Sequence, residues 1–441
     1  MGHGARAQQH HNLLAPLGQY LDSDVRLVIS NHDQGSHILN DELRHALLDH
    51  AAAGTLIDTE ELRRLENARD YGLGLLVVCP ADSPARRAQA AVRAGNVSAP
   101  MPYAAQFADE QSKSPLLQSL TSATFVYDPR PKMNFCHAPE LLDLHGAMSW
   151  HFRRHCNLRP LFQQSKLAQC SDMVLTPLGG VANATSPEGM RTSSEWADKT
   201  VRKVFWRGSM TGDHYSAKQA NRETYNWRHS HRPRLHLFAN NASGDARVWV
   251  RAAGGGWEQR TFAQAELSEK YLDVGLAGKV SQCDEDGTCE EMRAEIAFKE
   301  HVKPEEAKKY AYVIDTDGNG WSSRFHRLLS SGSMVIKTTI YPEWMTDWLT
   351  PWVHYVPVQA DYSDLYDVMS YFAGSPDSEG ADVGDAAARE IAQAAVQFTR
   401  THWRWEDMQA YMLRMVLEYA RLGADDRRAA SYLGNSRIVR Q

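Results

Sequence analysis

Short apolar runs alternate with longer stretches of helical composition along most of this 441-residue chain. Residues 75–79 and 310–314 contain only aliphatic, cysteine or tyrosine side chains and have the length of buried strands. Such alternation is typical of an α/β fold with a mainly parallel sheet covered by helices. By the same criteria we expect further strands at 25–30, 124–127, 173–178, 203–206, 247–251, 334–338 and 352–358, and helices at 41–53, from 59 onward, and at 139–155, 322–331, 386–403 and 406–422.

The length of the chain indicates two or three domains, at roughly 150 residues each. Residues 183–199 are rich in Ser, Thr, Pro, Gly and charge, which is typical of a linker. We therefore expect two α/β domains in series, at residues 1–195 and 196–385. Helices in residues 386–441 can then pack back on the first domain.

The charge balance excludes some classes of function. The chain carries 48 Lys and Arg against 54 Asp and Glu, whereas general nucleic-acid binding needs a basic face. A few local arginines can still hold a small anion. The apolar runs of the chain are far shorter than the ~20 residues of a membrane-spanning helix. The polar N-terminal stretch also lacks the apolar core of a signal peptide, so the chain is either cytosolic or numbered without its targeting segment.

Six cysteines in 441 residues are too few for a disulfide scaffold. Cys283 and Cys289 flank a short acidic loop, which a disulfide could close in an oxidising compartment. Two free thiols are the other interpretation, and the sequence leaves both open.

Residues 309–332 combine an expected strand, a polar glycine loop and an expected helix that ends at Gly332. A helix that begins just past a strand offers free N–H groups and a positive dipole end to a phosphate. Ser322 and Ser323 would add hydroxyl donors, and Arg324 a guanidinium suited to phosphate. The alternative is a capped helix with a solvated arginine.

The same loop admits two metal interpretations. Asp315, Asp317 and Gly320 fit an EF-hand calcium loop, but its twelfth position is His326 instead of glutamate, and a strand precedes it. Asp315 and Asp317 also form a D-x-D pattern, by which some nucleotide-sugar enzymes hold a divalent metal. His145, His151 and His155 have helical spacing, yet Phe152 occupies the place of the zinc-peptidase glutamate, which favours structural histidines.

A second cationic cluster follows the strand expected at 203–206. Arg207, Gly208 and Ser209 come directly after it, and Arg232 and Arg234 lie downstream. The carboxyl end of a strand in an open α/β sheet is where ligands bind. A surface turn with incidental arginines is the alternative.

Two aspartates follow other expected strands and are candidates for a general base. Asp33 ends the stretch that begins with the strand at 25–30, and Asp82 follows the strand at 75–79. Either residue could instead cap a turn. The chain has no Walker A, G-x-G-x-x-G or G-x-S-x-G motif, so kinase, Rossmann dehydrogenase and α/β-hydrolase functions lack their defining loops.

Taken together, three motifs resemble glycosyltransferase family 90, which contains fungal capsule-associated xylosyltransferases and animal protein O-glucosyltransferases. The motifs are WRGS at 206–209, DGNGWSSR at 317–324 and PWVHYVP at 351–357, and the likeness is strongest from about 201 to 372. Upstream, the sequence ending in Pro139, Leu141, His145 and Gly146 is similar to a further family segment. The resemblance implies a GT-B architecture, in which two Rossmann-like domains face each other across a cleft, with the acceptor on the first and the donor on the second.

The resemblance also implies roles for individual residues. Arg232 is similar to the family arginine that contacts the diphosphate. The donor is expected to bind at 207–209 and at 317–324, including Asp317, Gly320, Trp321, Ser322, Ser323 and Arg324. Asp33 is similar to the family's catalytic base, but the D-x-P of the family reads Asp33-Gln-Gly here. Asp82, which does stand in D-x-P, is the rival base.

The function expected from this resemblance is an inverting transfer of xylose or glucose from a UDP-sugar to a hydroxyl of a glycan or protein, with no metal or other cofactor. A non-catalytic UDP-sugar-binding relative is one alternative, and a metal-dependent hydrolase that uses Asp315, Asp317 and histidines is another. Family members work mostly in the secretory pathway, so the sequence does not decide the compartment.

Overall fold

The computed structural model describes residues 3–21, 24–30, 33, 39–66, 74–93, 125–149, 161–176, 193–217, 227–240, 243–378, 383–426 and 428. Its main feature is a five-stranded sheet in the order β6-β3-β7-β8-β9, in which every neighbouring pair is parallel. The strands are β3 (Val201–Gly208), β6 (Leu272–Leu276), β7 (Tyr310–Thr316), β8 (Met334–Thr338) and β9 (Val356–Pro357). The predicted parallel sheet is therefore confirmed, with strands at 203–206, 310–314 and 334–338.

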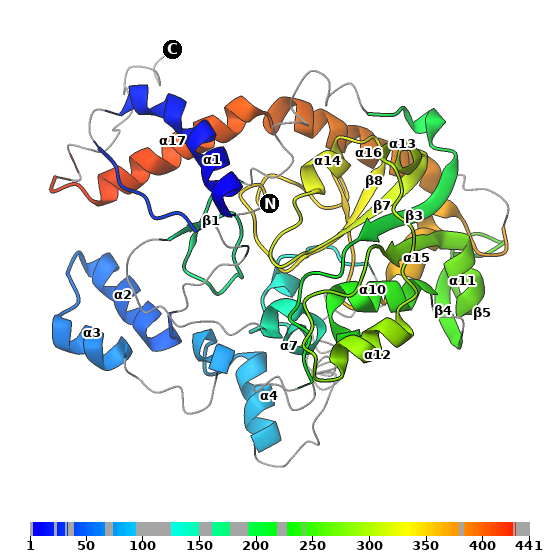
Figure 1. Cartoon of the computed structure of the whole chain (residues 1–441), viewed down its shortest axis with the longest axis horizontal. Coiled ribbons are helices and arrows are strands. Elements are labelled where there is room, and N and C mark those ends of the chain that lie inside the picture. The colour runs from blue at the N-terminus through cyan, green and yellow to red at the C-terminus, as the bar shows by residue number, and fades with distance from the viewer. Residues whose placement is uncertain are drawn as a thin grey trace.

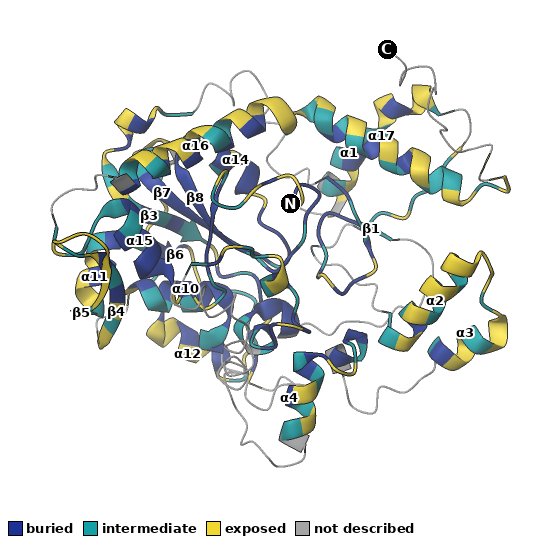
Figure 2. Ribbon diagram, turned by 180° about the vertical axis from the view of Figure 1, so that it is seen from behind, coloured by how far each residue is buried: buried dark blue, intermediate teal, exposed yellow. Residues whose placement is uncertain are grey.

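Helices cover both faces of this sheet (Figure 1). On β7, Val313 packs with α14 (Phe325–Leu329), α16 (Val383–His402) and α17 (Trp405–Leu422). Its neighbours Tyr312 and Ile314 point to the other face, where they pack with α10 (His231–Asn240), α11 (Gln264–Tyr271) and α15 (Leu365–Ala373). Because successive side chains alternate between faces, a strand buried on both sides is largely apolar, as residues 310–314 of β7 are. Figure 2 shows β7 and β8 as buried strands within the sheet.

The strand predicted at 247–251 lies outside the parallel sheet. It forms β4 (Asp245–Arg251), which pairs antiparallel with β5 (Trp257–Ala263). Gly255 and Gly256 in the connecting turn have φ values of 85° and 83°, which glycine adopts at no steric cost. The chain therefore reverses locally instead of crossing over a helix. This hairpin packs on α15, and Asp367 accepts a hydrogen bond from the main-chain N–H of Trp249.

The described part of residues 1–195 has little strand structure. Its strands are β1 (Phe162–Gln163) and β2 (Met173–Val174), which pair in parallel, and Ile29 forms a single bridge to Phe162. Helices predominate: α1 (His3–Leu14), α2 (Asp41–Ala53), α3 (Thr59–Glu66), α4 (Pro84–Arg93) and α7 (Leu141–Leu144). The structure is thus a mixed α/β fold with one substantial parallel sheet, and the two-domain GT-B arrangement stays a prediction.

Several local predictions in this half need correction. Residues 75–79 were expected as a strand, but Gly74–Val78 form a 3-10 helix. Cys79 is joined to Cys136 by a disulfide, which ties this segment to a small core around Phe135 and away from any sheet. Within 139–155 there are two short helical pieces, α7 and Gly146–Ser149, and residues 150–155 lie outside the described part. Residues 125–127 form no strand, and Thr124 lies outside the described part.

The predicted linker at 183–199 is only partly described, and residues 193–199 do not behave as a linker. Trp196 is buried in the main core, and the buried ammonium of Lys199 donates to Ser333 Oγ at 2.9 Å. Gly332 has a φ of 77°, and a Cβ there would come within 2.2 Å of the main-chain oxygen of Ser194. This segment is therefore packed against the end of α14. Residues 183–192 lie outside the described residues.

The C-terminal helices cross from the sheet to the N-terminal part of the chain (Figure 1). Helix α17 contacts α1, and the hydroxyl of Tyr411 donates to the main-chain oxygen of Val174 in β2. In the described residues, every helix is too short or too polar to cross a bilayer. The remaining helical segments are Ala15–Tyr20, Pro131–Met133, Trp196–Asp198, Trp227–His229, α12 (Thr288–Glu295) and α13 (Pro304–Ala307).

Candidate functional site

Two loops meet at the carboxyl edge of the parallel sheet. Strands β3 and β7 are parallel neighbours, so the loops after Gly208 and after Thr316 leave the sheet side by side. The main-chain N–H of Gly212 in the first loop donates to Asn319 Oδ1 in the second at 2.7 Å. The two predicted clusters, at 207–209 and 317–324, are thereby brought together at the edge where α/β sheets bind ligands.

Two guanidinium groups approach the indole ring of Trp206, near the end of β3. Cζ of Arg232 lies 5.8 Å from the ring centroid and Cζ of Arg324 lies 5.6 Å from it. Such contacts favour a cation over the face of the ring. Gly208 makes room for the ring, because a Cβ at this position would come within 2.3 Å of it. The sequence predicted both arginines and the glycine, but not the tryptophan that links them.

Arg232 is a buried cation whose hydrogen bonds, in the described part of the chain, all go to neutral oxygens. Its Nε donates to the main-chain oxygen of Asp317 at 2.7 Å, and its Nη1 donates to Ser209 O at 2.9 Å and to Thr211 Oγ1 at 2.6 Å. Burial, together with repulsion by Arg324, lowers the pKa of Arg232 to about 10. An anion placed here would relieve both penalties.

Arg324 brings a second positive charge. It donates to the main-chain oxygens of Arg207 and Thr316, each at 3.2 Å. One carboxylate oxygen, Asp315 Oδ1, lies 3.7 Å from its Nη2. Among the described residues, the contact with Asp315 is the one carboxylate contact of the two guanidinium groups. The carboxyl edge of the sheet is therefore electropositive and suited to a diphosphate.

The helix predicted at 322–331 is shorter than expected, and α14 begins only at Phe325. The hydroxyl of Ser322 donates to Asp315 Oδ1, and this bond holds 322–324 in a turn. Ser323 is exposed. A five-residue helix offers little dipole, so the predicted helix-end contribution to phosphate binding finds no support in the geometry. The two arginines carry the positive charge of the site.

Both aspartates of the D-x-D pattern are buried and occupied by donors. Asp315 Oδ2 accepts from Lys337 Nζ at 2.9 Å. Asp317 Oδ1 accepts from Thr339 Oγ1 at 2.7 Å, and its Oδ2 accepts from the N–H of Ile340 at 2.9 Å. These carboxylates therefore tie β7 to β8. In the described residues, no group of three or more acidic, histidine or cysteine side chains is arranged to hold a metal.

Lys337 and Glu343 form a buried ionic cluster with Asp315 that the sequence analysis missed. The ammonium of Lys337 lies 3.8 Å from the ring centroid of Phe325 and 3.9 Å from Glu343 Oε1. Burial raises the pKa of Glu343 to about 8, and the Lys337 charge opposes that rise. A lysine in an otherwise apolar strand was the available signal, because lysine is rarely buried without a partner.

Two stacked imidazoles support the loop at Asp317. The ring centroids of His145 and His231 lie 4.0 Å apart, and the two ring planes are nearly parallel, with 5° between them. His145 Nε2 lies 3.2 Å from Asp317 Oδ2, and His231 Nε2 lies 3.0 Å from the main-chain oxygen of Asp317. Burial lowers the pKa of both histidines. His145 thus has a structural role, and His151 and His155 lie outside the described residues.

The two candidate bases have different surroundings. The main-chain oxygen of Asp33 would lie only 1.9 Å from a Cβ on Gly320, so Asp33 borders the loop at 317–324. Its carboxylate forms an ion pair with Arg6 of α1, whose guanidinium also lies 5.8 Å from the ring of Trp321. Asp82 is exposed, just before α4, and its main-chain oxygen accepts from Arg87.

Arg207 and Ser209 occupy the predicted edge, but the arginine points away from the cluster. Side chains alternate along β3, so Arg207 faces opposite to Trp206. Its Nη2 donates to Asp273 Oδ1 on β6 at 2.6 Å, which neutralises the cation. Ser209 contributes its main-chain oxygen to Arg232, and its hydroxyl lies 3.5 Å from that of Thr211.

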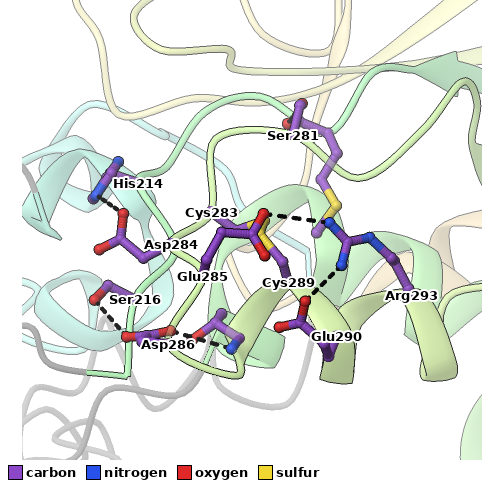
Figure 3. The surroundings of a disulfide bond; sticks show 12 residues. His214, Ser216, Ser281, Cys283, Asp284, Glu285, Asp286, Cys289, Glu290 and Arg293 are labelled. Carbon is purple, nitrogen blue, oxygen red and sulfur yellow. Dashed lines mark hydrogen bonds and ion pairs between the residues drawn. A yellow bond between two sulfur atoms is a disulfide. The ribbon is translucent and has the colours of Figure 1, made fainter.

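A disulfide closes the loop 283–289, and this loop and the two residues directly before it brace the first loop (Figure 3). Cys283 and Cys289 are bonded, which decides between the two interpretations that the sequence left open. Gln282, at a φ of 59°, accepts from the N–H of Gly212 at 3.2 Å, and Ser281 Oγ donates to Met210 O at 2.7 Å. The loop therefore fixes the chain that supplies acceptors to Arg232.

Two indole N–H groups at this edge have no hydrogen-bond partner among the described residues. They are Nε1 of Trp206 and Nε1 of Trp321, and both side chains are buried. A buried unpaired donor costs roughly 1–3 kcal/mol. An oxygen-rich ligand would satisfy such donors.

Comparisons with known proteins agree with the resemblance read from the motifs. Residues 259–428 match the family model described as glycosyl transferase family 90, so the predicted resemblance is confirmed. Protein O-glucosyltransferase 2 of Danio rerio is 35% identical over 123 residues, 28% of this chain and 23% of that relative. Protein O-glucosyltransferase 1 of Homo sapiens is 31% identical over 116 residues, 26% of this chain and 27% of the relative.

The O-glucosyltransferase rumi of Drosophila melanogaster is 29% identical over 131 residues, which are 29% of this chain and 28% of that relative. The matched stretches thus span roughly a quarter of these relatives. The family match includes the loop at 317–324, whereas Asp33, Trp206 and Arg232 lie outside it.

Proposed function

We propose that this chain, which carries a glycosyl transferase family 90 region, moves a sugar from a UDP-sugar donor to a hydroxyl of a protein or glycan. We further propose that the sugar is glucose or xylose, that the transfer inverts the anomeric carbon, and that no metal is required. The names of the relatives support glucose and a protein acceptor.

The observation that carries the proposal is the pair of guanidinium groups at the Trp206 ring. Arg232 bonds only neutral oxygens in the described residues, and Arg324 has one carboxylate, at 3.7 Å. A UDP diphosphate bound there would gain charge-assisted hydrogen bonds. Its oxygens would also accept hydrogen bonds from the unpaired indole N–H groups of Trp206 and Trp321.

The proposed independence from metal is supported by how the acidic side chains are used. Asp315 and Asp317 already accept from Lys337, Thr339 and a main-chain N–H. Holding a cation would require breaking these buried bonds. Arginines can instead stabilise the charge that develops on the departing diphosphate.

In the proposed reaction, an acceptor oxygen forms a bond to the anomeric carbon while the bond from that carbon to the diphosphate oxygen breaks. The hydroxyl proton passes to a carboxylate, and the electron pair leaves with UDP. We propose Asp33 as this base because it borders Gly320 and because its ion-pair partner, Arg6, lies over the ring of Trp321. The Asp33 carboxylate forms this ion pair with Arg6 of α1. Asp82 is the rival.

The test is UDP release from UDP-glucose, UDP-xylose, UDP-galactose and UDP-N-acetylglucosamine, with and without EDTA. Water can serve as a slow acceptor, so the natural acceptor need not be known. We expect release from UDP-glucose or UDP-xylose that EDTA leaves unchanged. Arg232→Lys should lower it by about 10²-fold, whereas Arg228→Lys, in a surface pair with Glu291 and Glu295, should not change it.

Substitution of the two aspartates identifies the base. Asp33→Asn should lower release by about 10²–10⁴-fold, and Asp82→Asn should leave it intact. The reverse result would assign the base to Asp82. Binding of UDP without release from any donor would indicate a non-catalytic relative, and loss of activity with EDTA would favour the metal-dependent alternative. A chain that does not bind UDP would contradict the proposal.

A further inference from the structure

A cavity lined by aromatic side chains lies at the amino ends of the parallel strands, whereas Arg232 and Arg324 lie at their carboxyl ends. Its volume is about 500 Å³, and its walls include Phe125, Tyr127, Trp352 and Tyr371. Trp352 precedes β9, and Tyr371 lies near the end of α15, so both belong to the amino edge of the parallel sheet. The cavity is within the range of ~300–1,000 Å³ that is usual for small-ligand sites.

The aromatic rings form a connected series that continues onto the surface. Ring centroids of Phe125 and Trp352 are 5.3 Å apart, those of Phe125 and Tyr371 are 5.9 Å apart, and Trp257 stacks on Tyr371 at 5.7 Å. Tyr127 is 76% exposed and Trp257 is 47% exposed. Large aromatic side chains with open faces are costly to leave in water, and clusters of them mark binding sites.

Trp352 is held in a strained backbone conformation in the wall of this cavity. Its φ is 65°, a value that bulky residues rarely adopt. Its N–H donates to Tyr355 O at 2.7 Å, and its indole Nε1 donates to Val126 O at 2.8 Å. Strain of this kind costs about 1–3 kcal/mol and clusters at ligand sites. The ring is thereby fixed before any ligand arrives.

The polar groups of the cavity are a pre-formed, neutral pair. Arg130 Nε donates to Asp128 Oδ1 at 2.9 Å, and its Nη2 donates to Asp128 Oδ2 at 2.9 Å. The two charges compensate each other, so the pair attracts no net charge. Their remaining lone pairs and N–H groups can still bind hydroxyls.

We propose that this aromatic cavity is a binding site for a neutral oligosaccharide, separate from the site of sugar transfer. A pyranose ring has C–H faces that pack on aromatic rings and equatorial hydroxyls that bond a carboxylate and a guanidinium at the rim. An anionic ligand would find no net positive charge in Asp128 and Arg130. A flat apolar partner surface would fit a concave pocket with an ion pair less well. The choice of carbohydrate rests in part on the proposed function, because a glycosyltransferase acceptor or product can be such a chain.

The test is calorimetric titration of the full chain with xylohexaose, cellohexaose, maltohexaose and mannohexaose, with and without saturating UDP. We expect at least one of these to bind, and UDP not to compete. Tyr127→Ser should weaken binding by about 10-fold or more. Trp348→Ser is the matched control, since Trp348 is a 48% exposed tryptophan that packs with Trp344 and Tyr411 instead; it should leave the affinity unchanged.

Three results would overturn the inference: no binding of any of the four sugars, binding that UDP abolishes, or equal affinities of Tyr127→Ser and the wild type. A cavity that serves a protein segment would give the first of these. The measurement requires no turnover, so its failure is distinct from failure of the proposed function. A chain that releases UDP yet binds no oligosaccharide would refute only the cavity site.

Discussion

Replacing Asp315 by asparagine tests whether the buried cluster beneath the arginines is held by charge. Lys337 is 5% exposed, and its ammonium donates to Asp315 Oδ2 at 2.9 Å. The second acidic side chain is Glu343, whose Oε1 lies 3.9 Å from Lys337 Nζ. Burial raises the pKa of Glu343 to about 8. Glu343 is therefore mostly protonated at pH 7, and Asp315 supplies most of the negative charge that Lys337 needs.

The expected loss follows from this unequal sharing. Removing one partner of a buried ion pair costs about 3–5 kcal/mol, because the other charge stays buried without compensation. Repulsion by Asp315 is one cause of the raised pKa of Glu343. In Asp315→Asn that repulsion disappears, so Glu343 can ionise and take over part of the pairing. We therefore expect a loss near the low end, about 3 kcal/mol.

Urea unfolding at pH 7 measures this loss, and two further variants make the result specific. Asp315→Asn with Lys337→Met removes both charges and should recover most of the stability. Asp347→Asn changes an exposed aspartate and should cost less than about 0.5 kcal/mol. A cost below about 1 kcal/mol for Asp315→Asn, or a double variant no more stable than the single one, would refute the ionic account.

Three other perturbations have defined outcomes. The raised pKa of Glu343 means that the folded protein keeps a proton that the unfolded chain loses, so the unfolding free energy should fall as pH rises from about 4.5 to 8; Glu343→Gln should flatten this slope in urea titrations. Gly320→Ala puts a Cβ 1.9 Å from Asp33 O and should weaken UDP binding by about 10-fold or more in calorimetry. Cys283→Ser with Cys289→Ser removes the disulfide directly after Gln282, the residue that braces Gly212, and should weaken UDP binding several-fold without unfolding the chain.

Matched controls separate these effects from general damage. Gly254→Ala meets no atom within 4 Å in the β4–β5 turn and should leave UDP binding unchanged. Cys79→Ser with Cys136→Ser removes the other disulfide, in the separate core around Phe135, and should lower stability without changing UDP affinity. A pH slope that persists in Glu343→Gln would contradict the role given to Glu343. Equal UDP affinities of Gly320→Ala and Gly254→Ala, or of the two double cysteine variants, would contradict the role given to Gly320 or to the Cys283–Cys289 disulfide.

The sequence predicted best those features that depend on neighbouring residues. Helix α2 runs over 41–53 as expected, because Asn40 caps its start and Gly54, at a φ of 67°, ends it. Strands β7 and β8 were recognisable as short, largely apolar runs between polar loops. The segment at 75–79 looked equally apolar, but it packs into a small separate core beside a disulfide and pairs with no strand in the part of the chain that the structure describes.

Several residues of the candidate site were proposed from the sequence, and the fold decides what each of them contacts. Arg207 and Arg232 both belong to the cationic cluster predicted after β3, and the family resemblance singled out Arg232. Strand alternation turns Arg207 toward Asp273 on β6, and only Arg232 reaches Trp206. Ser322 seemed to be a phosphate donor, but Asp315 takes its hydroxyl.

The sequence by itself determined the periodicity, the caps and the motif segments of this protein, since these depend on side chains within a few positions of one another. Only the tertiary structure decided the partners. His145 meets Asp317 across 172 residues, and Cys79 meets Cys136 across 57. Contacts of this separation depend on how elements far apart in the sequence pack together, and that packing depends on burying every apolar face at once. No local pattern records it.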